Sequence, residues 1–497
     1  MDKSIGKNIL FIYLANFGSS FFTFLFWITS ANLTDTEIIG TVATISSFAM
    51  ILGVLSNLDI GIGMKRFLGK AVAENNFQYF KNLCSTAFVF TTISAIIILI
   101  IAFNPIIDIL DIIGIDKEFI PIIAIIVIGN NLQHVIIGSL VSAKKSKSTT
   151  MPSIVASMSR FPILGILLFY LGTTTLAVAW SYSILYIVLT ISLMIITLKY
   201  LNSIPGSYFE KSYDNLKIII KGSFPRWIPQ IIVLLGTQLG ILIIFNVKGA
   251  EEAGLFYIPF AIMNVLFLIP HAINQVIHPI FSGMEDLDSQ LIYLKKTLKI
   301  AFFGTIPFAA IMYFYSAPIL SIFGKEFTKA DETFSVLLIG FPVAIIADAV
   351  YFLLYARGNY KRVLILGLIA NIPRIILYFI LVPEMGGVGG AIAYVIGMYC
   401  QFLLTIFYLE KMKVKIEYKK YLIISVIPFA IGYLLEFFNI GIIGGIILIL
   451  ISFIIFLKIK LIVREDINDV CKIFERSKES SQLSKRIINI LEKSHLL

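Results

Sequence analysis

Long apolar runs alternate with short polar segments along almost the whole chain. A helix of about 20 apolar residues crosses the roughly 30 Å hydrocarbon core of a bilayer. Because backbone polar groups must pair within such a segment, the runs are predicted to be transmembrane helices. We expect fourteen spans, at residues 8–30, 37–62, 84–103, 118–141, 152–172, 175–199, 223–246, 253–281, 300–317, 333–356, 363–382, 387–409, 421–437 and 440–460.

The composition agrees with an all-α, polytopic membrane protein. Of the 497 residues, 58% are hydrophobic and 14% are charged, whereas about a quarter of a soluble domain is charged. This excludes a disordered chain and an ordinary soluble enzyme. The three cysteines are too few for a disulfide framework or a Cys-type zinc site, and no complete P-loop is present. We therefore expect no cofactor, no metal and no enzymatic activity.

The basic residues are distributed unevenly between the predicted loops. If the N-terminus is cytoplasmic, 33 of the 40 Lys and Arg residues lie in inner segments, four lie in outer loops and three lie within spans. This bias follows the positive-inside rule and predicts a plasma-membrane protein with both termini in the cytoplasm. Attraction to anionic inner-leaflet lipid then accounts for the net charge of +10, and nucleic acid is not an expected partner.

An internal repeat is found when the sequence is aligned with itself at an offset of 214 residues. The aligned pairs include Glu37 with Glu251, Gly40 with Gly254, Tyr79 with Tyr293, Lys81 with Lys295, Arg160 with Arg374 and Gly172 with Gly386. Each repeat holds six spans, so both copies insert the same way up. We predict an N-terminal bundle (1–207), a C-terminal bundle (208–412), two additional spans (413–462) and a cytoplasmic amphipathic tail (463–497). Two such bundles enclose a cavity that opens alternately to either side, which indicates a transporter.

Arg160 in the fifth span and Arg374 in the eleventh occupy equivalent repeat positions near mid-membrane. A charge at that depth is costly and usually faces the bundle interior or a wet cavity. A guanidinium group binds phosphate through two parallel hydrogen bonds. The two arginines, with Asn371 one turn before Arg374, are therefore predicted to bind a diphosphate or another anionic head group across the cavity. The alternative is a structural role, such as an ion pair between Arg374 and Asp348.

Other polar residues within the spans are candidates for the cavity lining. Arg226 begins the seventh span and either faces the cavity or extends to the interface. The eighth span carries a polar stripe that either lines the substrate path or joins helices. The stripe consists of Asn264, His271, Asn274, Gln275 and His278. A metal site at His271 and His278 is disfavoured because no third ligand is evident.

Asp348 is the one carboxylate deep within a predicted span, and its repeat partner is His134. Both groups can take up or release a proton when their surroundings favour it. Either residue is therefore a candidate to accept a proton or to bind a cation during transport. The alternative is a satisfied polar contact inside the bundle.

The second span closes with the sequence NLDIGIGMKRFLGKA at residues 57–71. This stretch resembles the D-x-G…R signature of polysaccharide and lipid-linked oligosaccharide flippases. That family belongs to the multidrug/oligosaccharidyl-lipid/polysaccharide exporter superfamily. Fourteen spans in a 6 + 6 repeat with two extra helices agree with the resemblance. Asp59 and Arg66 of the motif either close an inner gate or anchor the helix end.

The resemblance implies translocation of a polyprenyl-(di)phosphate-linked glycan from the inner to the outer leaflet for cell-surface glycan synthesis. It also implies coupling to protons or monovalent cations, with glycan-assembly enzymes as partners. The main alternative is an ion-coupled multidrug-type antiporter. That function needs a net-acidic cavity, whereas the spans hold one deep carboxylate against two deep arginines. A membrane glycosyltransferase, a further alternative, needs larger soluble parts than these short loops.

Overall fold

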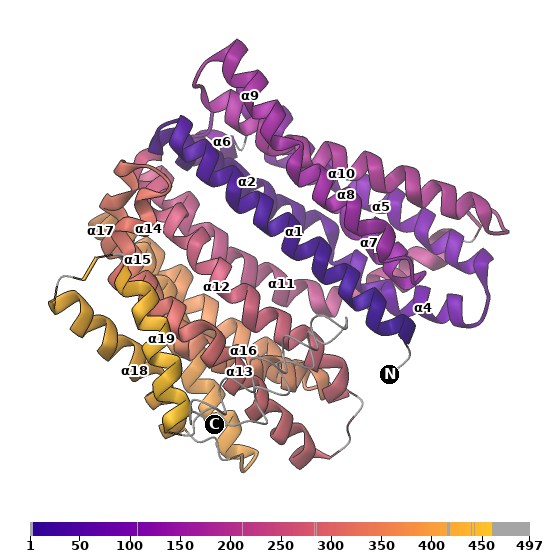
Figure 1. Cartoon of the computed structure of the whole chain (residues 1–497). Helices are drawn as coiled ribbons and strands as arrows, with labels where there is room; N and C mark the ends of the chain where they lie inside the picture. The colour runs from indigo at the N-terminus through magenta and orange to yellow at the C-terminus, as the bar shows by residue number, and fades with distance from the viewer. Residues whose placement is uncertain are drawn as a thin grey trace. The chain divides into compact units, whose positions relative to one another are not determined.

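A computed structural model describes residues 3–106, 108–210, 212–282, 284, 286–414, 418–438, 440–441 and 443–459. Within these ranges the chain is helical apart from short connections, and it contains no strand (Figure 1). The predicted tail (463–497) lies outside the described residues. The elements are α1 (Lys3–Leu33), α2 (Thr36–Asn57), α3 (Ile60–Gly63), α4 (Lys65–Ala73), α5 (Phe77–Ala102), α6 (Ile109–Ile113), the 3-10 helix η1 (Lys117–Phe119), α7 (Ile120–Ser142), α8 (Lys147–Met158), α9 (Arg160–Leu171), α10 (Thr175–Ser203), α11 (Ser212–Lys248), α12 (Ala250–Ser282), α13 (Leu287–Phe314), α14 (Ser316–Ser321), the 3-10 helix η2 (Lys325–Ala330), α15 (Asp331–Ile339), α16 (Phe341–Ala356), α17 (Tyr360–Lys411), α18 (Tyr418–Phe437) and α19 (Ile443–Lys458).

The all-α membrane architecture is confirmed. Among the described residues, nine helices are long and apolar enough to cross a membrane, and a pair bent by 43° (Lys325–Ile339 and Phe341–Ala356) makes ten. The 52-residue helix α17 covers both the eleventh and the twelfth predicted span. Its two parts meet at Gly386, where the helix is kinked. Helices α18 and α19 correspond to the last two predicted spans.

Three of the breaks in these helices have a local chemical cause. Pro162 has no N–H to donate to the carbonyl of Met158, where α8 ends and α9 begins. Pro342 likewise leaves the carbonyl of Leu338 without a helical donor at the joint between α15 and α16. Gly386 adopts φ 57° and ψ −132° inside α17, a conformation that glycine tolerates best.

The chain divides into two compact units, each described by itself here. Unit 1 comprises Met1–Ala261, Ile322–Thr333 and Gly367–Gly397, and unit 2 comprises Ile262–Ser321, Phe334–Leu366 and Met398–Leu497. These boundaries cut through α12 and α17 and do not coincide with those predicted at residues 207 and 412. The assignment of two six-span bundles therefore stays a prediction.

Helix α2 is the central element of unit 1. It lies against α5, α7 and α11, and 72% of its most apolar segment is buried. Small residues permit this close packing. For example, a Cβ atom added to Gly53 would lie 3.4 Å from the Asn130 side chain of α7.

In unit 2, α18 and α19 pack on α13 around a core that includes Ala310, Ile431 and Leu448. Two glycines bring them close: added Cβ atoms at Gly432 and Gly444 would lie 2.1 Å from Phe314 and 1.9 Å from the Tyr315 hydroxyl. The last two predicted spans are thereby attached to α13.

Candidate functional site

Arg160 is the first residue of α9 and is enclosed in unit 1. Its side chain is 2% exposed. The guanidinium carbon lies 4.5 Å from the ring centroid of Tyr182 and 5.3 Å from that of Phe26. Nη1 donates a hydrogen bond to the Thr23 hydroxyl at 3.1 Å. Helices α1 and α10 thus hold this cation against aromatic faces.

Arg374, in the first part of α17, has a similar environment. Its guanidinium carbon lies 3.8 Å from the ring centroid of Tyr394, and Nη1 donates to Asn371 Oδ1 at 2.9 Å. The residue is 5% exposed. Two glycines make room for this arrangement. A Cβ atom added to Gly397 would lie 2.8 Å from Arg374 Nε, and one added to Gly236 would lie 1.9 Å from Asn371 Oδ1.

The two arginines share three properties. Each stacks on a tyrosine of the following span, Tyr182 in α10 and Tyr394 in the second part of α17. Each has a buried Nε without a hydrogen-bond partner among the described residues. Neither forms an ion pair with a carboxylate of the described chain. The expectation that both face an open, watery cavity is wrong for this conformation, because both side chains are enclosed.

A row of aromatic rings runs between the two arginines. Tyr182 lies 5.5 Å from Trp27, and Trp27 lies 4.8 Å from Tyr257, measured between ring centroids. One turn further along α12, Phe260 lies 5.1 Å from Tyr394. The row therefore connects the two cation-bearing tyrosines inside unit 1.

The D-x-G…R stretch forms a break in the chain. Helix α2 ends at Asn57, five residues before the predicted end of the span. Leu58 and Asp59 both adopt left-handed backbone conformations, with φ 50° and 53°, which non-glycine residues rarely adopt. The Asn57 side chain stabilises the turn by accepting a hydrogen bond from the Asp59 N–H at 2.7 Å.

The two glycines of the same motif fit α3 between its neighbours. An added Cβ at Gly61 would lie 2.4 Å from the His134 carbonyl oxygen of α7. At Gly63 it would lie 2.0 Å from the Ser223 hydroxyl of α11. A larger residue would clash with α7 at Gly61 and with α11 at Gly63, so the two glycines permit the close packing that places Asp59 beside α11.

Asp59 pairs with Arg226, not with Arg66. The distance from Arg226 Nε to Asp59 Oδ2 is 2.6 Å, and the two side chains are 38% and 11% exposed. Arg66 lies exposed on α4 and is not the partner of Asp59. The role expected for Asp59 and Arg66, closing an inner gate or anchoring the helix end, stays a prediction. A second bond supports the pair, because Trp227 Nε1 donates to the Val54 carbonyl at 2.7 Å. The end of α2 is thus tied to the beginning of the seventh span.

At its other end, α2 meets α12 in a reciprocal contact. A Cβ atom added to Gly40 would lie 1.8 Å from the Ala250 carbonyl oxygen, and one added to Gly254 would lie 2.1 Å from the Thr36 carbonyl oxygen. Both glycines and both carbonyl residues are separated by 214 positions. Each repeat copy therefore offers the same surface to the other, as expected at a two-fold axis.

In unit 2, Asp348 of α16 pairs with His271 of α12. His271 Nε2 lies 3.4 Å from Asp348 Oδ2, and the side chains are 50% and 27% exposed. The His271 ring stacks on Phe267, which contacts Phe341. The suggested Asp348–Arg374 ion pair is wrong, because Arg374 instead bonds to Asn371.

The remaining predicted residues are scattered. Asn264 is exposed and Asn274 is buried, so the stripe on α12 does not line one open surface throughout. The side chains of Gln275 and His278 lie outside the described residues. His134 is exposed on α7, four residues before the buried Gly138.

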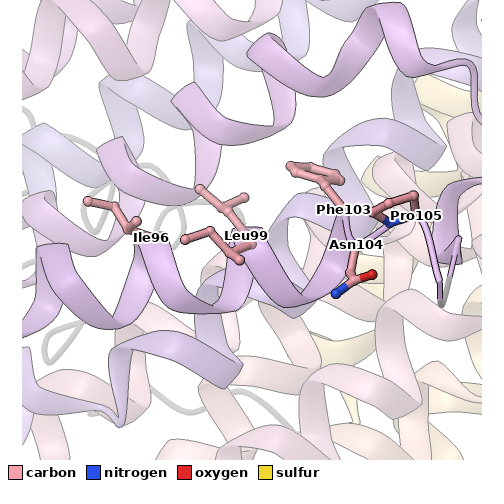
Figure 2. A pocket seen from close by; sticks show the side chains of 6 residues that line it. Ile96, Leu99, Phe103, Asn104 and Pro105 are labelled. Atoms are coloured by element: carbon pink, nitrogen blue, oxygen red, sulfur yellow. The ribbon is translucent and has the colours of Figure 1, made fainter.

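An apolar pocket lies apart from these residues, at the end of α5 (Figure 2). Its volume is about 430 Å³, and Ile96, Leu99, Phe103 and Asn104 are among its lining residues. Nearby, Lys117 donates a hydrogen bond to Asp108 at 2.9 Å, which lowers the pKa of that exposed carboxyl. None of the predicted site residues lines this pocket.

Residues that the sequence argument missed are the tyrosines beneath the arginines and Lys65. The tyrosines are not equivalent at the 214-residue offset, because Tyr182 follows Arg160 by 22 residues and Tyr394 follows Arg374 by 20. The only sequence signal is an aromatic residue at position 180, which aligns with Tyr394. Lys65 was counted only as one of the inner basic residues, although it interacts electrostatically with Asp59 and Arg226.

Comparison with known proteins identifies similar sequences and similar folds. Residues 12–171 match the MatE family model. A putative O-antigen transporter of Shigella flexneri is 26% identical over 243 residues, which is 48% of this chain. The match spans 57% of that relative, a little over half of its length.

Two solved structures share the fold over most of the chain. One is described as the lipid II flippase MurJ in an inward closed conformation, with a TM-score of 0.72, 16% identity, and coverage of 90% of this chain and 98% of that one. The other is an inward-facing multidrug resistance MATE transporter of the MOP superfamily, with a TM-score of 0.62, 15% identity, and coverage of 81% and 95%. At 15–16% identity these likenesses show a shared fold, the fold that the resemblance to the exporter superfamily implies.

Proposed function

We propose that this chain, which has the fold of the multidrug/oligosaccharidyl-lipid/polysaccharide exporter superfamily and a MatE domain at residues 12–171, is a flippase. Its substrate is a polyprenyl-phosphate-linked oligosaccharide or polysaccharide precursor for cell-surface glycans. Transfer runs from the inner to the outer leaflet by alternating access. The observation that carries this proposal is the pair of buried, carboxylate-free arginines at equivalent repeat positions.

The energetics of burial favour an anionic substrate. Removing a guanidinium from water without a counter-ion is costly, and a chain that keeps two such groups needs a reason to do so. In this conformation the tyrosine rings provide partial compensation, worth about 0.5–2 kcal/mol each. A phosphate or diphosphate provides the missing negative charge and binds the planar fork in two places. We infer that the arginines leave their tyrosines when substrate occupies the opened cavity.

The similar proteins support this choice of cargo. One curated relative is a putative O-antigen transporter, and one solved structure of the same fold is a lipid II flippase. A multidrug transporter also shares the fold, but a cavity for organic cations needs carboxylates, whereas the two buried mid-span charges at equivalent repeat positions, Arg160 and Arg374, are both cations. We accordingly expect leaflet transfer without chemical change, and no enzymatic activity.

The proposed location is the plasma membrane, with both termini in the cytoplasm. The basis is the concentration of 33 of the 40 basic residues in the segments on that side. In this orientation the Asp59–Arg226 pair faces the cytoplasm and the Gly40–Gly254 contact lies near the outer surface. Glycan-assembly enzymes on the cytoplasmic side are the proposed partners.

The His271–Asp348 pair is the proposed site of coupling to protons. An imidazole and a carboxylate at 3.4 Å can share or release one proton, which changes the charge of unit 2 by one. Asp348→Asn should abolish the acceleration of flipping by an imposed pH gradient while leaving downhill exchange. Glu384→Gln, at an exposed acidic position, is the matched control and should keep the acceleration. A gradient response that survives Asp348→Asn would contradict this assignment.

Reconstitution tests the function as a whole. Purified full-length protein is placed in liposomes with a fluorescent polyprenyl-diphosphate-linked oligosaccharide, and a membrane-impermeant quencher reports the label in the outer leaflet. Wild-type protein should equilibrate the lipid between leaflets. Arg160→Ala with Arg374→Ala should reduce the rate at least tenfold, the effect of about 1.4 kcal/mol. Lys70→Ala, at an exposed residue paired only with Glu74, is the basic control.

Equal rates in wild-type protein and the double arginine variant would contradict the assignment of these residues. Absence of transfer by wild-type protein, together with export of fluorescent organic cations, would favour the multidrug-type alternative. The unfolding temperature of each variant in detergent, compared with that of wild-type protein, detects a folding defect independently of transport.

A further inference from the structure

A second basic cluster surrounds Asp59 in unit 1. Arg226 contacts the Asp59 carboxylate at 2.6 Å, yet its side chain remains 38% exposed. Lys65, one residue after Met64 at the start of α4, interacts with the charges of both Asp59 and Arg226. Two cations therefore compete for one carboxylate.

His134 adds a third donor to this cluster. Its carbonyl contacts Gly61 of α3, and its exposed ring interacts electrostatically with Lys65. Helix α3 lies against both α7 and α11, and Lys65 begins the next helix, α4, which also lies against α7. The three basic side chains therefore come from α4, α7 and α11, which surround α3. The set carries a net charge of at least +1 when the imidazole is neutral.

The cluster has more positive than negative charge, because Arg226 and Lys65 share one carboxylate, that of Asp59. Burial and the neighbouring charge of Arg226 lower the pKa of Lys65, although Asp59 opposes this. Like-charge repulsion of this kind is relieved when an additional anion binds. A phosphate group can accept from Arg226, Lys65 and His134 together, because it has several oxygen acceptors.

We propose that Arg226, Lys65 and His134 form a loading site for the phosphate of the lipid-linked substrate, in which the phosphate replaces the Asp59 carboxylate as the partner of Arg226. This inference rests on the proposed function and adds a first station, separate from Arg160 and Arg374. Arrival of substrate then releases the tie between the end of α2 and α11. Replacement of the Asp59 carboxylate by the phosphate thereby couples substrate binding to separation of α2 from α11 at the Asp59 end.

The repeat confines this device to one side. The positions equivalent to Asp59 and Arg226 are Ile273 and Ile12, which are apolar. The Asp59–Arg226 pair therefore has no counterpart at the equivalent positions of the other repeat copy, whereas the arginine stacked on tyrosine is found in both copies. We expect the phosphate to enter between α2 and α11 and then to reach the paired arginines.

Trp227 provides a local reporter, because it follows Arg226 and bonds to Val54 of α2. The full chain, with its three tryptophans labelled as 5-fluorotryptophan, is studied by fluorine NMR in detergent, and Trp227→Phe identifies the signal. Pyrophosphate should shift the Trp227 signal in a saturable manner. Lys65→Gln should weaken its apparent affinity about tenfold, an effect expected for loss of a charged contact. Lys70→Gln should change it less than twofold.

Asp59→Asn gives the sharpest prediction. Removing the competing carboxylate should tighten pyrophosphate binding about tenfold, and the Trp227 signal should lie near its bound position before any pyrophosphate is added. Arg226→Lys keeps the charge without the fork and should retain part of the affinity. Because Lys65 makes no ion pair with Asp59 at contact distance, unlike Arg226, Lys65→Gln keeps the test valid if Arg226 variants do not fold.

Three outcomes would overturn the loading site. One is an equal shift with sulfate or chloride at matched ionic strength. Another is an equal effect of Lys65→Gln and Lys70→Gln. The third is a shift caused by phosphatidylglycerol in nanodiscs that blocks pyrophosphate, since the occupant would then be an ordinary lipid headgroup. Any of these leaves the flippase proposal standing if Arg160 and Arg374 variants still lose leaflet transfer, so the two failures are distinguishable.

Discussion

The two ends of α2 are held by different physical means. At the Gly40 end, backbone meets backbone across a symmetric contact with Gly254, and no side chain intervenes. At the Asp59 end, a left-handed turn presents one carboxylate to Arg226, and the equivalent positions of the repeat are apolar. A close backbone contact tolerates rotation about a fixed point but not separation. An ion pair can exchange partners, so we infer that the first end is a pivot and the second is a gate.

Filling the pivot should have the largest effect. A leucine at Gly40 places atoms where the Ala250 carbonyl oxygen now lies, 1.8 Å from the first added carbon. We expect a loss of about 3 kcal/mol, the upper end of the cost of overpacking, measured as a lower unfolding temperature in detergent. Gly165→Leu, at an open position with no neighbour within 4 Å, should leave the unfolding temperature nearly unchanged. Equal effects of the two substitutions would show that Gly40 is not a pivot.

Exchanging the charges of the gate should separate its two roles. Asp59→Arg alone places two arginines together, and Arg226→Asp alone places two carboxylates together, so each should destabilise the protein by about 1–2 kcal/mol, after allowance for solvent screening at the partly exposed Arg226. The double swap should recover most of that stability. It should not recover leaflet transfer, because the phosphate donor then projects from α2's end instead of α11. Full recovery of both would contradict a specific role for Arg226.

Removing the stacking rings tests whether the paired arginines behave alike. Tyr182→Leu and Tyr394→Leu each remove one cation–π contact, worth about 0.5–2 kcal/mol. We expect similar losses of stability at the two sites, since the guanidinium distances are 4.5 and 3.8 Å. Unfolding of the two variants under one set of conditions measures this. A large loss at one site alone would show that the repeat copies have different functions.

The smallest effect is expected at an exposed ion pair, which serves as a reference for the gate. The hydrogen bond from Lys117 lowers the pKa of Asp108, so any stabilisation is present above the ordinary pKa of Asp and is lost as the pH falls through the lowered value. Asp108→Asn should therefore unfold slightly earlier than wild-type protein near neutral pH and identically in strong acid. A difference that grows on acidification would have the wrong sign for this pair.

The all-α membrane architecture could be predicted from the sequence, because hydrocarbon thickness imposes a long apolar run on every span, whereas the division into two six-span bundles stays a prediction. The spans at 118–141 and 175–199, for example, correspond closely to α7 and α10. The break after Asn57 was missed, since it depends on a side-chain hydrogen bond to the Asp59 N–H within an otherwise apolar run. The pattern of apolar residues along the sequence does not reveal such a turn.

The candidate site was predicted only in part. Arg160, Arg374 and Arg226 stand out because charge is costly in a membrane, but their partners lie on other helices. The pairings Asp59 with Arg226 and Asp348 with His271 depend on which helix faces which. The second differs from the Asp348–Arg374 ion pair that the sequence left open as an alternative. Enclosure of the arginines by Tyr182 and Tyr394 depends on the conformation, which no linear pattern specifies.

The most direct test of the central claim is a structure of the full-length protein with a bound polyprenyl-diphosphate-linked oligosaccharide, determined in nanodiscs by electron cryomicroscopy. The account predicts phosphate oxygens at about 2.7–2.9 Å from guanidinium nitrogens of both Arg160 and Arg374, with Tyr182 and Tyr394 no longer covering them. A substrate whose phosphates lie elsewhere, while both arginines stay stacked on their tyrosines, would contradict it.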